Sequence, residues 1–181
     1  MENNFVAKNI AYYLDEYTNI ITFGMTPREE YLFNSYLLPE IFKNVKTRKV
    51  NLMIDPKRDF KDSVFFVDLD DVSFPSSYNT PGGMLSRGKE LQRYMEQLKT
   101  FCIENNNSVI VKKGVYNSYG NDSIGITNLS PHSLAYTSDV ILMMDKGVLR
   151  SAKNRHDTVD IINHSLIALM REQKINEILK D

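Results

Sequence analysis

The sequence lacks the features that identify secreted and membrane-spanning proteins. It contains one cysteine, Cys102, so no internal disulfide can form, and we expect a reduced, buried thiol. The first four residues, MENN, do not provide the basic region and apolar core of a secretion signal. No apolar run is long enough to span a bilayer. We therefore expect a cytoplasmic protein with no membrane partner.

The sequence also lacks an excess of charge of either sign. Its 22 basic and 23 acidic residues give a formal net charge of −1, which argues against a broadly basic surface. Any contact with nucleic acid must then come from local patches or be shared among subunits. The hydrophobic fraction of 42% and the length of 181 residues are typical of one globular domain, which we take as residues 1–181.

The hydrophobic periodicity predicts an α/β fold. The helical patterns cover residues 4–16, 27–44, 86–104 and 131–137, and a further one covers the C-terminal segment. The strand patterns cover residues 19–24, 50–54, 64–68, 108–113, 139–145, 148–153 and 159–163. Glycine-bearing polar segments near 73–85 and 114–129 are typical of loops. This order predicts a mostly parallel central sheet flanked by helices, with an antiparallel extension.

The C-terminal segment has helical spacing of its apolar residues. These residues are Leu166, Leu169, Met170, Ile175 and Ile178. The opposite side is polar, with Arg171, Glu172, Lys174 and Glu177. The segment could dock on another protein, but we expect its apolar face to pack on the sheet of its own domain.

The stretch ITFGMTPREEY joins a predicted strand to a predicted helix through Gly24. This is the setting of a phosphate-binding loop, G-x-x-x-x-G-K-[ST]. Glu29, Glu30 and Tyr31 stand at its last three positions. Two acids there would repel a triphosphate by several kcal/mol in a partly screened site. Gly24 and a replacement cation, Arg28, are the remaining candidates for holding a nucleotide, and ordinary ATP hydrolysis is not expected.

Two further segments complete a recognisable order of elements. VFFVDLDDV is a buried strand that ends in an acid, and a glycine-bearing loop and the long helix MLSRGKELQRYMEQLKTFCIENNN follow it. LSPHSLAYTSDVILMMDKGVLRSAKNRH comes after the next strand. This order resembles the ATPase core of the RecA family, especially the recombinases of large phages, with DnaB-type helicases as relatives. The resemblance runs from Asn19 to Ile162 and implies a phage protein with a RecA-like P-loop fold and a degenerate phosphate loop.

The resemblance implies roles for three residues beyond the loop. Asp68 matches the carboxylate that holds the magnesium shell. Lys153 and Arg155 match basic residues that reach across a subunit interface and stabilise the phosphoryl group transferred on the neighbour. The family's water-activating glutamate corresponds to Lys57 here, or, with a shifted alignment, to one of the nearby acids Asp55, Asp59 and Asp62. Without the resemblance, Asp68 is equally the polar end of a strand, and the two basic residues form a solvated strand face.

The resemblance also places the two polar loops where RecA-like proteins present DNA-binding loops. Aromatic side chains in the loops could stack on bases, and neighbouring basic ones could bind phosphates. The aromatic residues are Tyr78, Tyr116 and Tyr119, and the basic residues are Arg87, Lys89, Lys112 and Lys113. The alternative is that both segments are ordinary surface loops.

Together these patterns favour a non-hydrolysing accessory of DNA recombination, replication or repair. Such a protein would act through single-stranded DNA, through a RecA-like recombinase or helicase partner, or through self-association, and would need no cofactor. One alternative is a DNA-dependent ATPase that holds ATP and magnesium in the altered loop. Another is an interaction or inhibitor protein that re-uses the fold.

Overall fold

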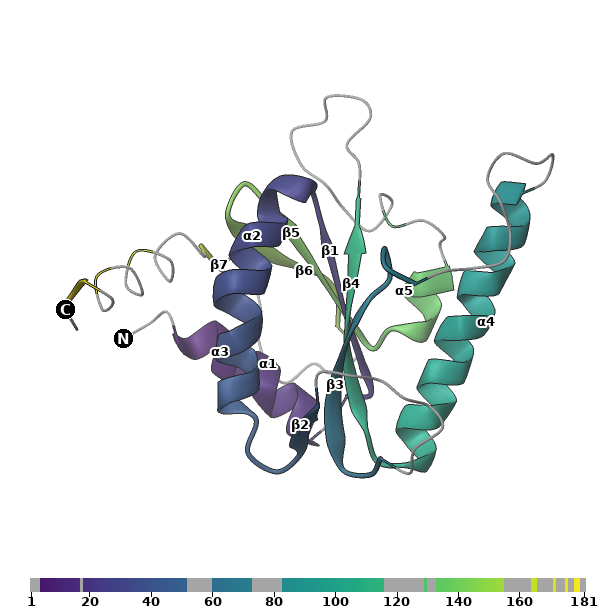
Figure 1. The fold of residues 1–181 in the computed structure, drawn as a ribbon, viewed down its shortest axis with the longest axis horizontal. Helices are drawn as coiled ribbons and strands as arrows, with labels where there is room; N and C mark the ends of the chain where they lie inside the picture. Colours follow the sequence, from purple (N-terminus) through teal and green to yellow (C-terminus); the bar gives the residue numbers. More distant parts are fainter. Residues whose placement is uncertain are drawn as a thin grey trace.

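The protein is an α/β structure in which helices cover both faces of one sheet (Figure 1). The computed structural model describes part of the chain. The described residues are 4–16, 18–51, 60–72, 83–115, 129, 133–154, 164–165, 171, 175, 178 and 179. The predicted α/β class, with a mostly parallel sheet flanked by helices, is confirmed.

The sheet has seven strands in the order β2-β3-β4-β1-β5-β6-β7. The strands are β1 (Ile20–Met25), β2 (Lys49–Asn51), β3 (Ser63–Asp68), β4 (Ser108–Gly114), β5 (Val140–Asp145), β6 (Val148–Asn154) and β7 (His164–Ser165). Strands β2, β3, β4, β1 and β5 pair in parallel. Strands β6 and β7 extend the sheet in the antiparallel direction.

The turn between β5 and β6 explains where the antiparallel extension begins. Its two residues, Lys146 and Gly147, have positive φ values of 51° and 72°. Positive φ at both central positions is the geometry of a tight hairpin turn whose twist matches the flanking strands. The antiparallel strand pair predicted around this dipeptide is therefore confirmed.

The helices form two layers. They are α1 (Asn4–Glu16), the 3₁₀ turn η1 (Pro27–Glu29), α2 (Glu30–Leu32), the π-helical turn η2 (Phe33–Leu37), α3 (Leu38–Asn44), α4 (Gly83–Glu104) and α5 (Ser133–Thr137). Helices α1 to α3 lie on one face of the sheet and α4 and α5 on the other (Figure 1). Among the described residues, no helix has the length and apolarity needed to cross a membrane.

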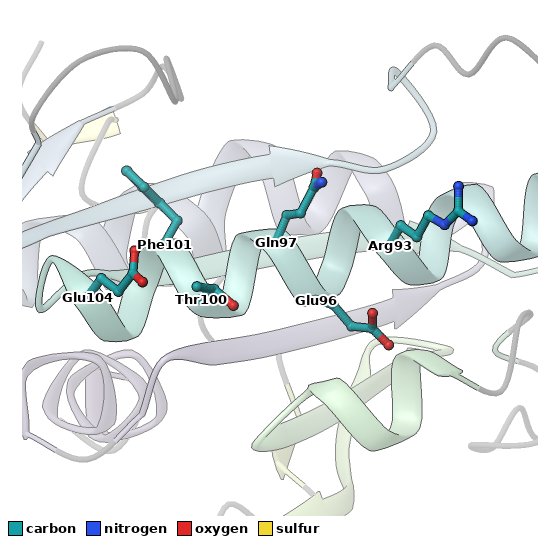
Figure 2. A pocket seen from close by; sticks show the side chains of 6 residues that line it. All are labelled: Arg93, Glu96, Gln97, Thr100, Phe101 and Glu104. Carbon is teal, nitrogen blue, oxygen red and sulfur yellow. The ribbon is translucent and has the colours of Figure 1, made fainter.

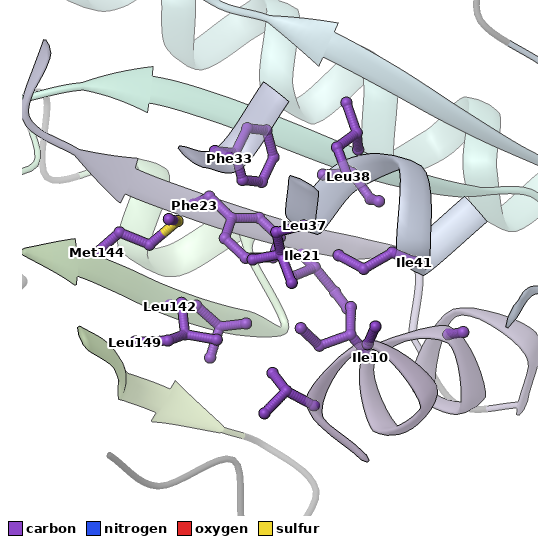
Figure 3. Packing of buried hydrophobic residues seen from close by; sticks show 14 of the residues in the cluster. Ile10, Ile21, Phe23, Phe33, Leu37, Leu38, Ile41, Leu142, Met144 and Leu149 are labelled. Carbon is purple, nitrogen blue, oxygen red and sulfur yellow. The ribbon is translucent and has the colours of Figure 1, made fainter. Parts of the chain in front are cut away.

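Each face of the sheet has its own hydrophobic core, because successive strand residues point to opposite faces. On the α1–α3 side, Phe23 of β1 packs against Phe33, with ring centroids 4.8 Å apart and the ring planes tilted by 51° (Figure 3). On the α4 side, Phe65 and Met95 belong to a second core. Cys102 lies there too, fully buried, and burial raises the pKa of its thiol to about 12, as expected for a packing residue.

The helix after β1 is irregular for a reason visible in the sequence. Pro39 has no N–H group and its ring crowds the preceding turn, so a regular α-helix cannot pass through it. The chain widens into the η2 turn just before it, where the N–H of Leu38 donates to the carbonyl of Phe33. The single helix predicted over residues 27–44 is thus a series of four helical pieces.

Three other predicted boundaries differ from the structure. Strand β1 continues through Gly24 to Met25, and α4 begins at Gly83, three residues earlier than predicted. In the described part of the chain β2 ends at Asn51. The strand predicted at 159–163 lies outside the described residues, while the short β7 follows it.

The C-terminal segment does not pack as predicted at the positions that the structure describes. Ile175, Ile178 and Leu179 are 56%, 73% and 77% exposed. The N–H of Leu179 donates to the carbonyl of Ile175 at 3.0 Å, which is a helical turn. The expectation that Ile175 and Ile178 would be buried against the sheet of their own domain is therefore wrong.

A buried carboxylate ties the amino end of β1 to the α4 side of the sheet. Asp139, 8% exposed, accepts hydrogen bonds from the backbone N–H groups of Asn19 and Ile20, both at 3.1 Å. Its other oxygen accepts one from the Lys99 ammonium at 3.1 Å. One side chain thus satisfies the start of the central strand and anchors α4.

We expect Asp139→Ala to lower the free energy of unfolding by about 3 kcal/mol, because it leaves the buried Ile20 N–H without its acceptor and the Lys99 ammonium without its carboxylate partner. Lys99 then keeps the Thr137 carbonyl as its acceptor. Urea denaturation followed by circular dichroism measures this loss. The exposed Asp71→Ala serves as the control and should change stability by less than about 0.5 kcal/mol. Equal effects from the two variants would contradict the anchoring role.

Candidate functional site at the carboxyl ends of the strands

The strand order creates a switch point between β1 and β4. The connection that leaves β1 runs through α2 and α3 to the far strand β2, whereas the connection that leaves β4 runs through α5 to β5. The two connections therefore leave neighbouring strands in opposite directions. In open α/β sheets, ligands bind outside the carboxyl ends of the strands at such a point. The candidate site is built here.

Three charged side chains meet at this point. The ammonium of Lys112, on β4, lies 2.6 Å from Asp68 Oδ2 and 3.3 Å from Glu30 Oε1. Asp68 is the last residue of β3 and lies directly opposite Lys112 in the parallel register. Glu30 is the first residue of α2. The lysine thus links two strands to the helix that follows β1.

Lys112 is almost fully enclosed, since only 4% of its side chain is exposed. Burial alone would lower the pKa of this ammonium. The hydrogen bonds and negative charges of Asp68 and then Glu30 outweigh burial and raise the pKa of Lys112 above its ordinary value. Lys112 is therefore held in its charged form by its two carboxylate partners.

A third acid and a second lysine lie at the same edge of the sheet. Asp70 accepts hydrogen bonds from the Lys113 ammonium at 2.6 Å and from the Gly114 N–H at 2.8 Å. Partial burial alone would raise the pKa of Asp70, but these two bonds and the charges of both lysines lower it below its ordinary value. The N–H of Asp70 in turn donates to Asp68 Oδ1 at 3.0 Å. The two acid–lysine pairs form one network.

The junction after β1 is too short for a phosphate-binding loop. The strand ends at Met25 and the first helical turn begins at Pro27, so Thr26 alone connects them. Gly24, predicted to begin the loop, is a strand residue paired with Lys113 and Met143. A Cβ at Gly24 would lie 2.6 Å from the Met143 Cε, so this glycine allows close packing between strands.

The two acids in the first helical turns have partners within the chain. Glu29 is 7% exposed, and its Oε2 accepts a hydrogen bond from the Gly147 N–H in the β5–β6 turn at 3.1 Å. Glu30 pairs with Lys112. The predicted repulsion of a polyanion by these acids therefore needs correction, because Lys112 offsets the charge of Glu30.

The described residues do not fit a magnesium–nucleotide complex of the P-loop type. Asp68, predicted to hold the magnesium shell, has its carboxylate bound to the Lys112 ammonium and the Asp70 N–H. No group of three or more potential metal ligands occurs among the described residues. Arg28, the proposed replacement cation, is an exposed residue of η1.

Lys153 lies apart from this network. Strand β6, which carries it, is separated from β3 by β4, β1 and β5. Its ammonium donates to the backbone carbonyls of Ala135 and of Ser138, the latter at 2.8 Å, at the end of α5. Lys153 thus holds α5 against the sheet in this conformation. Arg155, the other predicted finger, lies outside the described residues.

The predicted nucleic-acid contacts fall into three groups. Tyr78, Tyr116 and Tyr119 lie outside the described residues. Arg87 and Lys89 lie in the first turns of α4 and are half-buried and exposed, respectively, while Lys113 is half-buried in its pair with Asp70. Lys112 is 3% exposed and has no accessible ammonium to offer a phosphate, so we remove it from the predicted contacts.

The sequence matches no protein-family model and no curated protein.

The structural role of Lys112 was missed because a lysine at the end of a strand is usually a surface residue. Two signals pointed to it. Lys112 follows Ile110 by two residues and Asp68 follows Phe66 by two, so both lie on the face of the sheet that α1 to α3 cover. Asp68 also ends β3 and Asp70 lies in the turn after it, while Lys112 and Lys113 are among the last three residues of β4, which pairs directly with β3.

We expect Lys112→Met to lower the free energy of unfolding by about 3 kcal/mol, because it leaves the Asp68 carboxylate beside an apolar side chain. Chemical denaturation measures this loss. The double variant Lys112→Met/Asp68→Asn should recover part of it, since the more buried carboxylate is then neutral and only the more exposed Glu30 has lost its cation. Lys113→Met, at the more exposed pair, is the control. A loss from Lys112→Met no larger than that from Lys113→Met would contradict the buried-pair assignment.

The pKa of Lys112 also predicts how stability depends on pH. The folded state raises this pKa above the ordinary value of 10.5, so the contribution of Lys112 is fully present below that pH. It is lost as the pH rises through the higher folded value. Chemical denaturation of wild type and of Lys112→Met should be measured in steps from neutral pH to above 10.5. The difference between their free energies of unfolding should become smaller as the pH rises. A difference that grows in alkali would contradict the shift.

Proposed function

We propose that this chain is a RecA-like protein that does not hydrolyse nucleotide and serves as an accessory of DNA recombination, replication or repair. Its fold and element order support the comparison with RecA-like proteins that the sequence suggests. We infer the absence of nucleotide hydrolysis from the ion-pair network of Lys112 with Asp68 and Glu30. It lies at the switch point where an enzyme of this kind would hold magnesium and phosphate.

The network supports this proposal because the Asp68 carboxylate is already bound to a cation of its own chain. A magnesium ion would compete with the Lys112 ammonium for Asp68, at a contact of 2.6 Å in a nearly enclosed setting. A triphosphate needs several inward-pointing backbone amides, which a glycine-rich loop supplies. The single residue Thr26 between strand and helix offers no such loop. Binding of a nucleotide would therefore require the chain to break its own ion pairs and to rebuild this junction.

The remaining function in this proposal is binding of single-stranded DNA at the same end of the molecule. Helix α4 follows β3 in the chain and precedes the start of β4, so its first turns lie toward the carboxyl ends of the strands (Figure 1). These turns carry Arg87 and Lys89. A cation beside the positive end of a helix favours a phosphate ligand. The predicted loops near 73–85 and 114–129, which hold the predicted aromatic contacts, follow β3 and β4 in the chain.

Association with an active RecA-like partner is the second part of the proposal. The finger role suggested by the sequence now rests mainly on Arg155, because the Lys153 ammonium binds carbonyls of its own chain. In a complex, such a finger would act on nucleotide held by the neighbour. This chain would then influence hydrolysis without holding a nucleotide itself.

We expect the protein to bind fluorescently labelled single-stranded DNA at low salt, with an affinity that magnesium and ATP leave unchanged. Lys89→Ala should weaken this binding and lower the slope of log affinity against log salt by about 0.7, the value for one phosphate contact. Fluorescence anisotropy across a salt series measures both quantities.

Lys61→Ala is the matched control for the DNA experiment, because Lys61 is exposed near the opposite, amino end of β3. It should leave the salt slope unchanged. Tight magnesium-dependent binding of ATP would overturn the non-hydrolysing assignment. Absence of DNA binding at low salt would remove the DNA part and leave the partner-binding part as the function.

A further inference from the structure

The outer face of α4 has a polar stripe with a shallow hollow along it. The hollow has a volume of about 500 Å³. Its lining residues all come from this helix: Arg93, Glu96, Gln97, Thr100, Phe101 and Glu104 (Figure 2). The spacing 93, 97, 100 and 104 follows one side of a helix. These four positions therefore form a continuous stripe.

The charges on this stripe are separated along the helix. Arg93 stands at one end and Glu104 at the other, about 16 Å apart at the rise of an α-helix. Both side chains are exposed, and neither has an ion-pair partner among the residues that the structure describes. Glu104 is the last residue of α4, whose last turn contains no basic side chain. A carboxylate at this position is repelled by the negative end of the helix dipole.

We propose that the outer face of α4 binds the same face of a second copy of this chain, with the two helices antiparallel. With the contact centred between Gln97 and Thr100, Arg93 lies opposite the partner's Glu104, and the reverse pair forms at the other end. Gln97 then lies opposite the partner's Thr100 in both directions. The pairing also brings each helix dipole beside the opposite one.

The stripe favours a second copy because it is complementary to itself. A two-fold axis places the same patch on both chains, so a surface with a cation at one end and an anion at the other satisfies itself twice. A partner of one charge sign would match only one end. Ile103, 60% exposed, lies near the stripe and adds apolar contact area. This interface goes beyond the proposed function and uses neither Lys112 nor Lys89.

Charge reversal tests the pairing directly. Sedimentation velocity over a range of protein concentrations should show a dimer for wild type. Arg93→Glu or Glu104→Arg should each raise the dimer dissociation constant at least about tenfold, because each places two like-charged pairs in the interface. The double variant Arg93→Glu/Glu104→Arg should restore the dimer. An equimolar mixture of the two single variants should restore it too, as a heterodimer.

Two variants away from α4 control for general effects of charge and of helix ends. Lys8→Glu reverses an exposed cation on α1, and Glu16→Arg reverses an exposed acid at the last residue of α1. Neither should change the dissociation constant. Circular dichroism confirms that all variants are folded. A monomeric wild type at every concentration, or reversals that neither the double variant nor the mixture rescues, would overturn the proposal.

Discussion

The carboxyl edge of this sheet is organised by one constraint, which is the need to keep a buried ammonium charged. An enclosed lysine is stable only with anionic partners at hydrogen-bonding distance. Lys112 meets that need with the last residue of β3 and the first residue of α2. This contact requires the β3–β4 register, which places Asp68 beside Lys112. It also requires the chain to leave β1 in the direction that brings Glu30 to the same lysine.

As a consequence, the charges of this site are balanced by partners within the chain and need no ligand. In an enzyme at this position of an α/β sheet, charges of opposite sign are brought together by binding a metal or a phosphate. Here the opposing charges are all supplied by side chains of the same chain, with Asp70 and Lys113 repeating the pattern one step further out. This arrangement supports the proposal that the protein does not transfer phosphoryl groups.

The parts of the fold that depend on periodicity could be predicted from the sequence. The long helix α4, the apolar strands β3 and β5 and the hairpin at Lys146–Gly147 follow from spacing and turn chemistry. The details of the site could not. Whether β1 ends at Gly24 or Met25 depends on pairing with two neighbouring strands, and the burial of Lys112 depends on which strand lies beside it. Both are properties of tertiary contacts, so a local pattern does not contain them.

The one-residue junction at Thr26 has a consequence for any attempt to build a phosphate-binding loop at this position. Replacing Glu29, Glu30 and Tyr31 with glycine, lysine and threonine would restore the letters of a phosphate loop. In this fold, however, residues 24 and 25 belong to a strand and residues 27–29 to a helical turn, so the backbone does not curve around a phosphate. The hairpin would also lose the Glu29 contact that fastens it. These substitutions alone would therefore not build a phosphate-binding loop, because the backbone between β1 and α2 would also have to change its conformation.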